Sequence, residues 1–160
     1  MRLLVLCVGR TKAGPERELV ARYMDRARAS GRAIGVSAVD LCEIDESRAR
    51  RPEDRKAEEA RAVLARVPPG ASLIALDESG RLLSSRDFAD EIGSRRDQGS
   101  SAVAFVVGGP DGHAESVRAS ASLVLSLGRM TFPHRLVQIL LAEQIYRAVT
   151  ILAGHPYHRN

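Results

Sequence analysis

Residues 103–112 read VAFVVGGPDG, and this stretch decides the fold. Its first five residues are all apolar, which is typical of a strand covered on both faces of a parallel sheet. The glycines that follow let the backbone approach a ligand closely. Ligands of parallel α/β sheets bind at the carboxyl ends of the strands. The stretch therefore predicts a strand that ends at a binding site, although a plain tight turn would give the same pattern.

The glycine run matches neither common phosphate-binding motif. Val107 stands where a dinucleotide-binding G-x-G-x-x-G motif would have its first glycine. A G-x-x-x-x-G-K-[ST] loop is also missing from the sequence. The loop thus favours a ligand without a polyphosphate, or no ligand.

Four further apolar runs, at residues 3–8, 34–41, 73–76 and 123–127, are typical of buried strands. Helical patterns alternate with them. We expect helices to begin at Pro15 and Pro52, after Ser84, near residue 114 and at Pro133. Ser84 and Asp87 resemble a capping box. This alternation predicts an α/β fold with a parallel sheet.

The last of these helices is the longest, and Gly154 suits the position just after its end. Its apolar residues recur at helical spacing and cover more than one face. They are Leu136, Val137, Leu140, Leu141, Ile145, Val149 and Leu152. One face could cover the sheet while another meets a partner subunit. A helix packed on all sides in the core would give the same pattern.

The composition is that of an ordinary soluble domain. The chain has 160 residues, 44% of them hydrophobic and 28% charged, which suits one domain. Its opening apolar run is too short for a signal peptide or a membrane span, so we expect a cytoplasmic protein without membrane contact. Cys7 and Cys42 are interpreted as buried free thiols because they sit in apolar runs and form no C-x-x-C pair.

The positive charge is concentrated late in the chain. From Ser116 onward there are five arginines and a single acid, Glu143, and the net charge of the whole chain is +4. A basic region confined to one part of a chain suits a phosphate-rich partner such as a nucleic acid. A solvated face, or a genome that favours arginine codons, would give the same concentration of arginine.

Two late segments carry further chemistry. Residues 127–134, LGRMTFPH, join the last strand to the last helix and can bring backbone groups toward the glycine loop, where they could read an adenine edge beside an apolar wall from Leu76. The tail, residues 155–160, reads HPYHRN. His155 and His158 could share a metal, but no further ligand has matching spacing, so no metal site is expected.

Together these pieces resemble a known family. They are VGGPDG at 107–112, LS at 125–126, MTFPH at 130–134, LAEQIYRA at 141–148 and PYHR at 156–159. Upstream, Val8-Gly9 with Lys12, and Leu76-Asp77 followed by Gly80, also fit. The chain closely resembles the ribosomal RNA large subunit methyltransferase H family, small members of the SPOUT class, over essentially its whole length.

This resemblance implies a single SPOUT domain over residues 1–160, with a mostly parallel sheet flanked by helices and a deep C-terminal trefoil knot. Such a knot is an exception to the rule that chains do not thread loops. The knot and a site for S-adenosylmethionine (SAM) would lie within about residues 73–160. Carried over by motif, the SAM pocket is Leu76, Gly108, Leu127, Gly128, Arg129, Met130, Thr131 and Phe132.

The resemblance also implies a reaction. The family acts as a homodimer, with its site near the subunit interface, and makes N3-methylpseudouridine in 23S rRNA on the assembled ribosome. We expect His158 to act as general base or orienting group, with Tyr157 and Arg159 binding the nucleotide. Alternatively, His158 only holds RNA and water takes the proton. Arg129 would serve SAM through its backbone and face RNA with its side chain, and His134 would have a local packing role.

Two residues depart from the family pattern. Gln138 stands where an arginine is expected, which would weaken one RNA contact, and His113 stands where an apolar residue is expected. Neither is expected to touch the SAM pocket. Three rival functions stay open: a SAM-dependent enzyme acting on another RNA, a ribosome-binding module without catalysis, and a small-molecule enzyme of nucleotide-binding α/β type.

Overall fold

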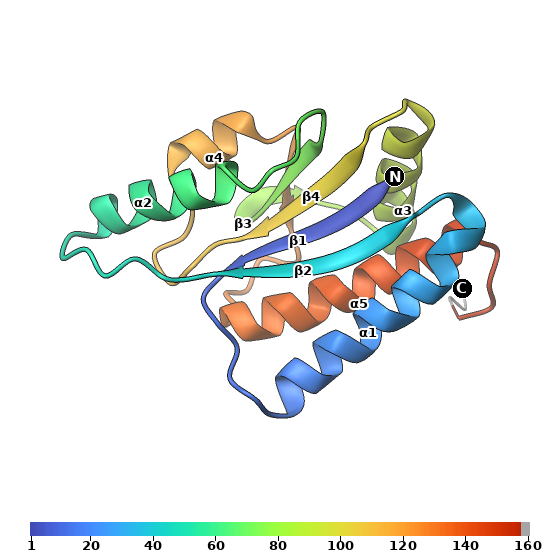
Figure 1. The fold of residues 1–160 in the computed structure, drawn as a ribbon, viewed down its shortest axis with the longest axis horizontal. Coiled ribbons are helices and arrows are strands. Elements are labelled where there is room, and N and C mark those ends of the chain that lie inside the picture. The colour runs from blue at the N-terminus through green and yellow to red at the C-terminus, as the bar shows by residue number, and fades with distance from the viewer. Residues whose placement is uncertain (158–160) are drawn as a thin grey trace.

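A computed structural model describes residues 1–157 of the chain (Figure 1). Its strands are β1 (Arg2–Val8), β2 (Ala38–Ile44), β3 (Ser72–Leu82), β4 (Ala102–Val107) and β5 (Leu123–Ser126). Its helices are α1 (Pro15–Gly31), α2 (Pro52–Leu64), α3 (Ser85–Asp97), α4 (Glu115–Ser120) and α5 (His134–Leu152), with a short 3-10 turn, η1 (Arg32–Ile34), after α1. The predicted alternation of strands and helices is confirmed.

The five strands form one sheet in the order β2-β1-β4-β3-β5, and every neighbouring pair is parallel. Because side chains alternate along a strand, each central strand contributes side chains to two hydrophobic cores, one on each face of the sheet. Leu3 and Val5 of β1 belong to one core, and Leu4 and Leu6 belong to the other. Continuous apolar runs are therefore required here, as the sequence predicted.

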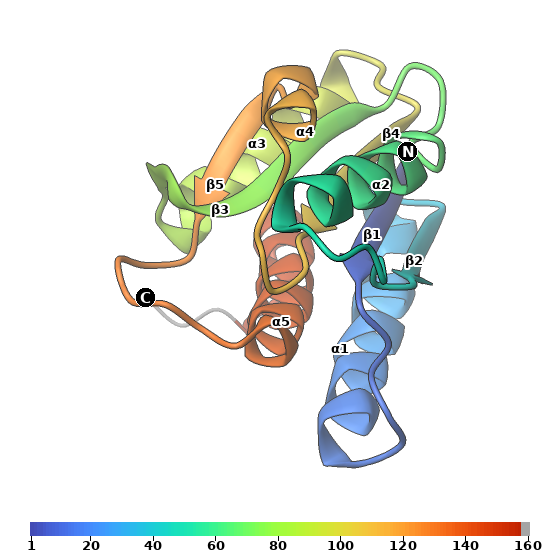
Figure 2. The same ribbon diagram turned by 90° about the vertical axis from the view of Figure 1, so that its left-hand side faces the viewer.

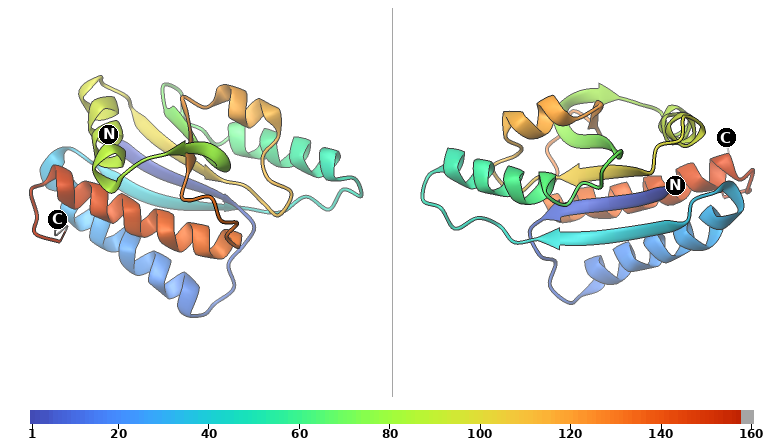
Figure 3. Two further views of the ribbon diagram at one scale, coloured as in Figure 1. Left: turned by 180° about the vertical axis from the view of Figure 1, so that it is seen from behind. Right: turned by 45° about the horizontal axis from the view of Figure 1, so that its top comes forward.

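Helices cover both faces of this sheet. Buried residues of α1, α3 and α5 pack on one face, and those of α2 and α4 pack on the other. Figure 2 shows the two groups on opposite sides, with α2 and α4 above the sheet and α1 and α5 below it. Seen from behind, α5 lies between α1 and α3 (Figure 3). Within residues 1–157 the structure has no helix of the length and apolarity that crossing a membrane requires.

The local signals at helix ends are confirmed in two places. Ser84 accepts a hydrogen bond from the Asp87 amide while the Asp87 carboxylate accepts one from the Ser84 amide, which completes the capping box of α3. Gly154 follows α5 with φ +67°, a conformation that glycine adopts at little cost.

Two strand predictions were wrong at their bounds. Residues 34–37 precede β2, because η1 continues the first helix and Gly35, with φ +78°, reverses the chain there. The third strand runs to Leu82, six residues beyond the apolar run. Its polar second half still pairs with β5, after a register shift between Leu76 and Arg81. Cys42 is only half-buried because β2 is an edge strand, while Cys7 is buried as expected.

Helix α5 has both a buried and an open face. Leu141, Ile145 and Val149 are fully buried against the sheet and its neighbouring helices, whereas Leu136 and Leu140 are 46% and 39% exposed. The interpretation of α5 as a helix packed on all sides is thus wrong for its first half. The C-terminal trefoil knot stays a prediction.

Candidate active site

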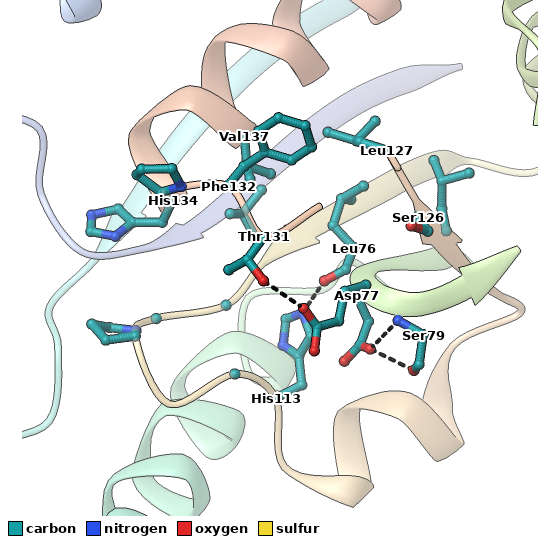
Figure 4. Close-up of a pocket in the computed structure, with 18 of the residues that line it drawn as sticks. Leu76, Asp77, Ser79, His113, Ser126, Leu127, Thr131, Phe132, His134 and Val137 are labelled. Atoms are coloured by element: carbon teal, nitrogen blue, oxygen red, sulfur yellow. Dashed lines mark hydrogen bonds between the residues drawn. The ribbon is translucent and has the colours of Figure 1, made fainter. Parts of the chain in front are cut away.

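A cavity of about 910 Å³ opens at the carboxyl ends of β4 and β5 and beside the middle of β3. This volume lies within the usual range for small-molecule sites. The walls come from residues 76–79, 107–113, 125–128 and 130–134, with Lys56, Arg118 and Val137 completing them. Figure 4 shows Phe132 and Val137 on one side of this cavity, with Asp77, His113 and Thr131 on the other. Several segments that are far apart in the sequence thus share one site.

Seven of the eight residues predicted to bind the cofactor line this cavity. They are Leu76, Gly108, Leu127, Gly128, Met130, Thr131 and Phe132. The eighth, Arg129, is exposed and does not contribute to the lining. That these residues hold SAM stays a prediction.

The loop from β5 to α5 is shaped by a few hydrogen bonds. The Ser126 hydroxyl accepts from the Gly128 amide and donates to the Gly128 carbonyl at 2.8 Å. The Thr131 hydroxyl donates to the Glu78 carboxylate at 3.2 Å. Among residues 1–157, no backbone hydrogen bond is formed by residues 129–132. Their amides and carbonyls are therefore free to meet the polar edge of a ligand.

His113 is part of this site, contrary to the prediction that it would not touch the pocket. The loop turns back at Gly112, whose amide donates to the Gly109 carbonyl, and this reversal buries the His113 side chain. The ring nitrogen Nε2 donates to the Leu76 carbonyl at 2.9 Å. Burial holds the pKa of His113 below its usual value, so the ring is neutral at neutral pH.

Two side chains of α2 anchor the glycine loop. Arg55 makes a bidentate ion pair with Asp111, with Nε and Nη2 at 2.6 and 3.1 Å from the carboxylate oxygens. This hydrogen-bonded guanidinium lowers the pKa of Asp111. Glu59 is buried beside Gly109, where an added Cβ would lie 3.2 Å from Oε2, and burial raises the pKa of Glu59. Neither residue was singled out from the sequence.

His134 lies at the mouth of the cavity, at the first position of α5. Its Nε2 and the Glu46 carboxylate both border Gly9, where an added Cβ would lie 3.5 and 2.9 Å from them. The histidine therefore lines the cavity while its ring nitrogen lies toward Gly9 and a carboxylate, and its expected local role in hydrogen bonding or packing stays a prediction.

The tail residue Tyr157 lies far from this cavity in its own chain. Its hydroxyl donates to Glu143 at 3.2 Å, and its ring packs 4.5 Å from that of Tyr146 and beneath Arg147. These partners follow His134 by nine to 13 residues, which is roughly 14–20 Å along a helix axis. Burial and Glu143 raise the pKa of Tyr157 to about 12. His158 and Arg159 lie outside the described residues.

Gln138 points into the protein rather than toward a partner. It is 2% exposed, and its Oε1 accepts from the Thr11 hydroxyl at 3.0 Å. Its Nε2 is buried and finds no acceptor among the described residues. Position 138 is on the buried side of α5, where the Gln138 side chain meets Thr11. That glutamine here weakens an RNA contact stays a prediction.

We expect Thr11→Val to destabilise the fold by about 1–3 kcal/mol, because it leaves the buried Gln138 amide without its remaining partner. Combining it with Gln138→Met should restore most of this loss, since both polar groups are then gone. Urea unfolding of the single and double variants measures the difference. A double variant that is less stable than Thr11→Val would show that the amide is not the cause.

Comparison with known proteins places this site in a family. Residues 1–158 match the family model described as "Predicted SPOUT methyltransferase". The chain is 60% identical to the ribosomal RNA large subunit methyltransferase H of Xanthobacter autotrophicus, over 99% of each chain. It is 59% identical to that of Methylocella silvestris, over the full length of both.

A solved structure, the SpoU methyltransferase AviRb from Streptomyces viridochromogenes in complex with AdoMet, is more distantly similar. It shares 15% identity over 92% of this chain and 59% of that chain, with a TM-score of 0.41. By the full-length matches in sequence, the chain belongs to the SPOUT methyltransferases and, among them, to the ribosomal RNA large subunit methyltransferase H family.

Proposed function

We propose that this protein transfers the methyl group of SAM to N3 of a pseudouridine in 23S rRNA of the assembled ribosome. The observation that carries this proposal is the cavity at the edge of the sheet, lined by seven motif residues, in a chain about 60% identical to ribosomal RNA large subunit methyltransferases H. A single domain, residues 1–160, would perform the reaction in the cytoplasm, where ribosomes are found.

The residues around the cavity fit SAM. The free backbone groups of residues 129–132 suit the polar edge of an adenine, and Leu76, Leu127 and Phe132 offer apolar walls for its faces. Asp77 and Glu78 add negative charge that suits a sulfonium. When bound, SAM would supply an activated methyl group. The part left to the chain is alignment, which can provide much of the rate.

A second subunit would complete the site. The tail residue Tyr157 is held at the far end of α5 by Glu143 and Arg147, so Tyr157 of one chain is remote from that chain's own cavity. Leu136 and Leu140 leave an apolar strip open near the cavity end of the same helix. A homodimer that covers this strip could bring the partner's tail to the cavity.

The tail would then handle the nucleotide. The N3 position of pseudouridine must lose a proton before or during methyl transfer, and His158 is our candidate for the base or orienting group. Tyr157 and Arg159 would bind the nucleotide. Arg129, exposed beside the cavity, would face RNA with its side chain.

The assembled ribosome, rather than free RNA, fits the surface of this chain. Its net charge of +4 favours phosphates, but affinity gained in that way is salt-sensitive and poorly specific. Aromatic residues make up only 4% of the sequence, so there are few platforms for reading unpaired bases. A folded ribosomal surface would supply the missing specificity through its shape.

Transfer of labelled methyl from SAM to ribosomes that lack this modification tests the proposal, with deproteinised 23S rRNA in parallel. We expect label on intact ribosomes, at N3 of a pseudouridine, and much less on free RNA. Label at another nucleotide would indicate a different RNA target. Binding to the ribosome without any transfer of label would indicate a non-catalytic module. Transfer to small molecules without RNA would contradict an RNA methyltransferase altogether.

Variants separate the roles within this assay. Arg129→Ala should keep the affinity for SAM and lose RNA methylation if only its side chain contacts RNA. His158→Ala should slow turnover on bound ribosomes by about 10²–10⁴-fold if His158 is the general base. Unchanged turnover would leave proton removal to water.

A further inference from the structure

The cavity holds one buried titratable side chain that stands between two of its motif residues. His113 is 5% exposed and lies on the loop between β4 and α4. Its ring contacts two neighbouring strands, at Leu76 in the middle of β3 and at Gly108 just after β4. Figure 4 shows this ring beneath Leu76, at the base of the site.

The contact with Leu76 occurs where the sheet becomes irregular. Pairing of β3 with β5 shifts register directly after Leu76, and the imidazole Nε2 supplies a side-chain donor to the Leu76 carbonyl at 2.9 Å. A carbonyl oxygen can only accept, so Nε2 must carry the hydrogen. The position of this carbonyl in the cavity wall therefore depends on a donor at His113 Nε2.

The contact with Gly108 is tight. A Cβ added at Gly108 would lie 3.1 and 3.2 Å from Cε1 and Nδ1 of the His113 ring. The ring thus fills the space that glycine leaves, and it fixes how the backbone of the glycine loop passes the cavity. One side chain thus contacts two backbone segments, at Leu76 and at Gly108, that line the same cavity.

We propose that His113 is a positioning residue of the cofactor pocket, whose neutral ring holds the Leu76 carbonyl and the Gly108 backbone in place and makes the affinity for SAM sensitive to pH. This inference rests on the proposed function. An apolar side chain at this position would fill the same space but could not donate to Leu76.

The charges around the ring set the direction of the pH effect. Burial lowers the pKa of His113, and Arg118 of α4 acts in the same direction, whereas the Leu76 and Val106 carbonyls and Asp77 of β3 oppose it. Lys56 of α2 lines the same cavity. Because the folded-state pKa is lowered, the neutral ring predominates at neutral pH and becomes protonated only in acid. A third positive charge in the wall, added to those of Lys56 and Arg118, would then repel a sulfonium.

Nitrogen NMR of the protein without ligand gives the first test. At neutral pH we expect His113 to be the Nε2–H tautomer, and its titration midpoint to lie below that of an unperturbed histidine, about 6.5. An Nδ1–H tautomer, or a midpoint above this value, would overturn the proposal. The measurement needs no variant and no activity.

Calorimetric titration with SAM and with the neutral-sulfur product, S-adenosylhomocysteine, gives the second test. At neutral pH His113→Leu should raise the Kd for both by roughly five- to tenfold, as expected for a lost buried hydrogen bond, while His113→Gln, which keeps a donor, should restore most of the affinity. Thermal unfolding of each variant establishes that it is folded. His155→Gln, at the far end of α5, is the matched control and should bind as the wild type does.

Lowering the pH from about 8 to about 5 should weaken the binding of SAM by the wild type more than the binding of S-adenosylhomocysteine. The Kd for SAM should rise by at most about tenfold per pH unit, which is the limit when binding is linked to one proton. The difference should persist in His155→Gln, which lies outside the cavity, and vanish in His113→Gln. If the wild type binds both ligands but folded His113→Leu has the same Kd values at every pH, the role of His113 is wrong while the proposed function stands. If the wild type binds neither ligand, the proposed function fails, and the inference with it.

Discussion

Gly80→Ala should destabilise the protein by about 3 kcal/mol or more and lower its Tm by roughly 6–12 °C. A Cβ at Gly80 would lie 2.7 Å from backbone atoms of Val124 and Leu125, and backbone atoms of a paired strand cannot rotate away as a side chain can. Relief requires β3 and β5 to separate. Since residues just before Gly80 and just after Leu125 line the cavity, SAM affinity should fall as well.

Gly93→Ala is the matched control for this prediction. Gly93 lies within α3, and its added Cβ would meet only the end of the Leu152 side chain, at 3.0 Å. That side chain can shift, and alanine favours a helix over glycine by about 0.5–1 kcal/mol. Calorimetric unfolding should therefore place Gly93→Ala near the wild type. Equal stability of the two variants would mean that β3 and β5 approach less closely than described.

The class of fold could be predicted because it depends on patterns that are local in sequence. Each central strand is buried on both sides, so its residues are continuously apolar, and proline or a capping box marks where helices begin. The extension of β3 to Leu82 was missed for the opposite reason. Its polar residues pair with β5 at the end of the sheet, and backbone pairing leaves no hydrophobic signal.

The cavity could be located in part, because strand ends and their following loops are visible in the sequence. What periodicity does not show is which side chains from elsewhere reach the site. Arg55 and Glu59 of α2 lie against the glycine loop that borders the cavity, and His113 is drawn inward by the loop reversal at Gly112. Such contacts depend on the tertiary arrangement of α2 and the glycine loop rather than on either segment alone.

Co-expression of two inactive variants should restore methyl transfer if the site is shared between subunits. Gly108→Val carries a larger side chain toward the cavity and the His113 ring, and should abolish SAM binding. His158→Ala keeps the cavity and alters the tail. In a mixed dimer, the intact cavity of the second variant can meet the intact tail of the first. Dimers purified through two different tags should then regain about half of wild-type activity, because one of two equivalent sites is whole.

The alternative is a tail that folds back on its own chain. Tyr157 would then have to leave Glu143, Tyr146 and Arg147 and cross roughly 14–20 Å along α5. Every chain of a mixed dimer would in that case carry either a blocked cavity or an altered tail, and the dimer would stay inactive. A dimer in which one chain carries both substitutions and the other is wild type is the control. If tails are exchanged, this control should be inactive, because the wild-type cavity meets an altered tail and the wild-type tail meets a blocked cavity. If each tail acts within its own chain, the wild-type chain should stay active. The two arrangements therefore predict opposite results for both dimers.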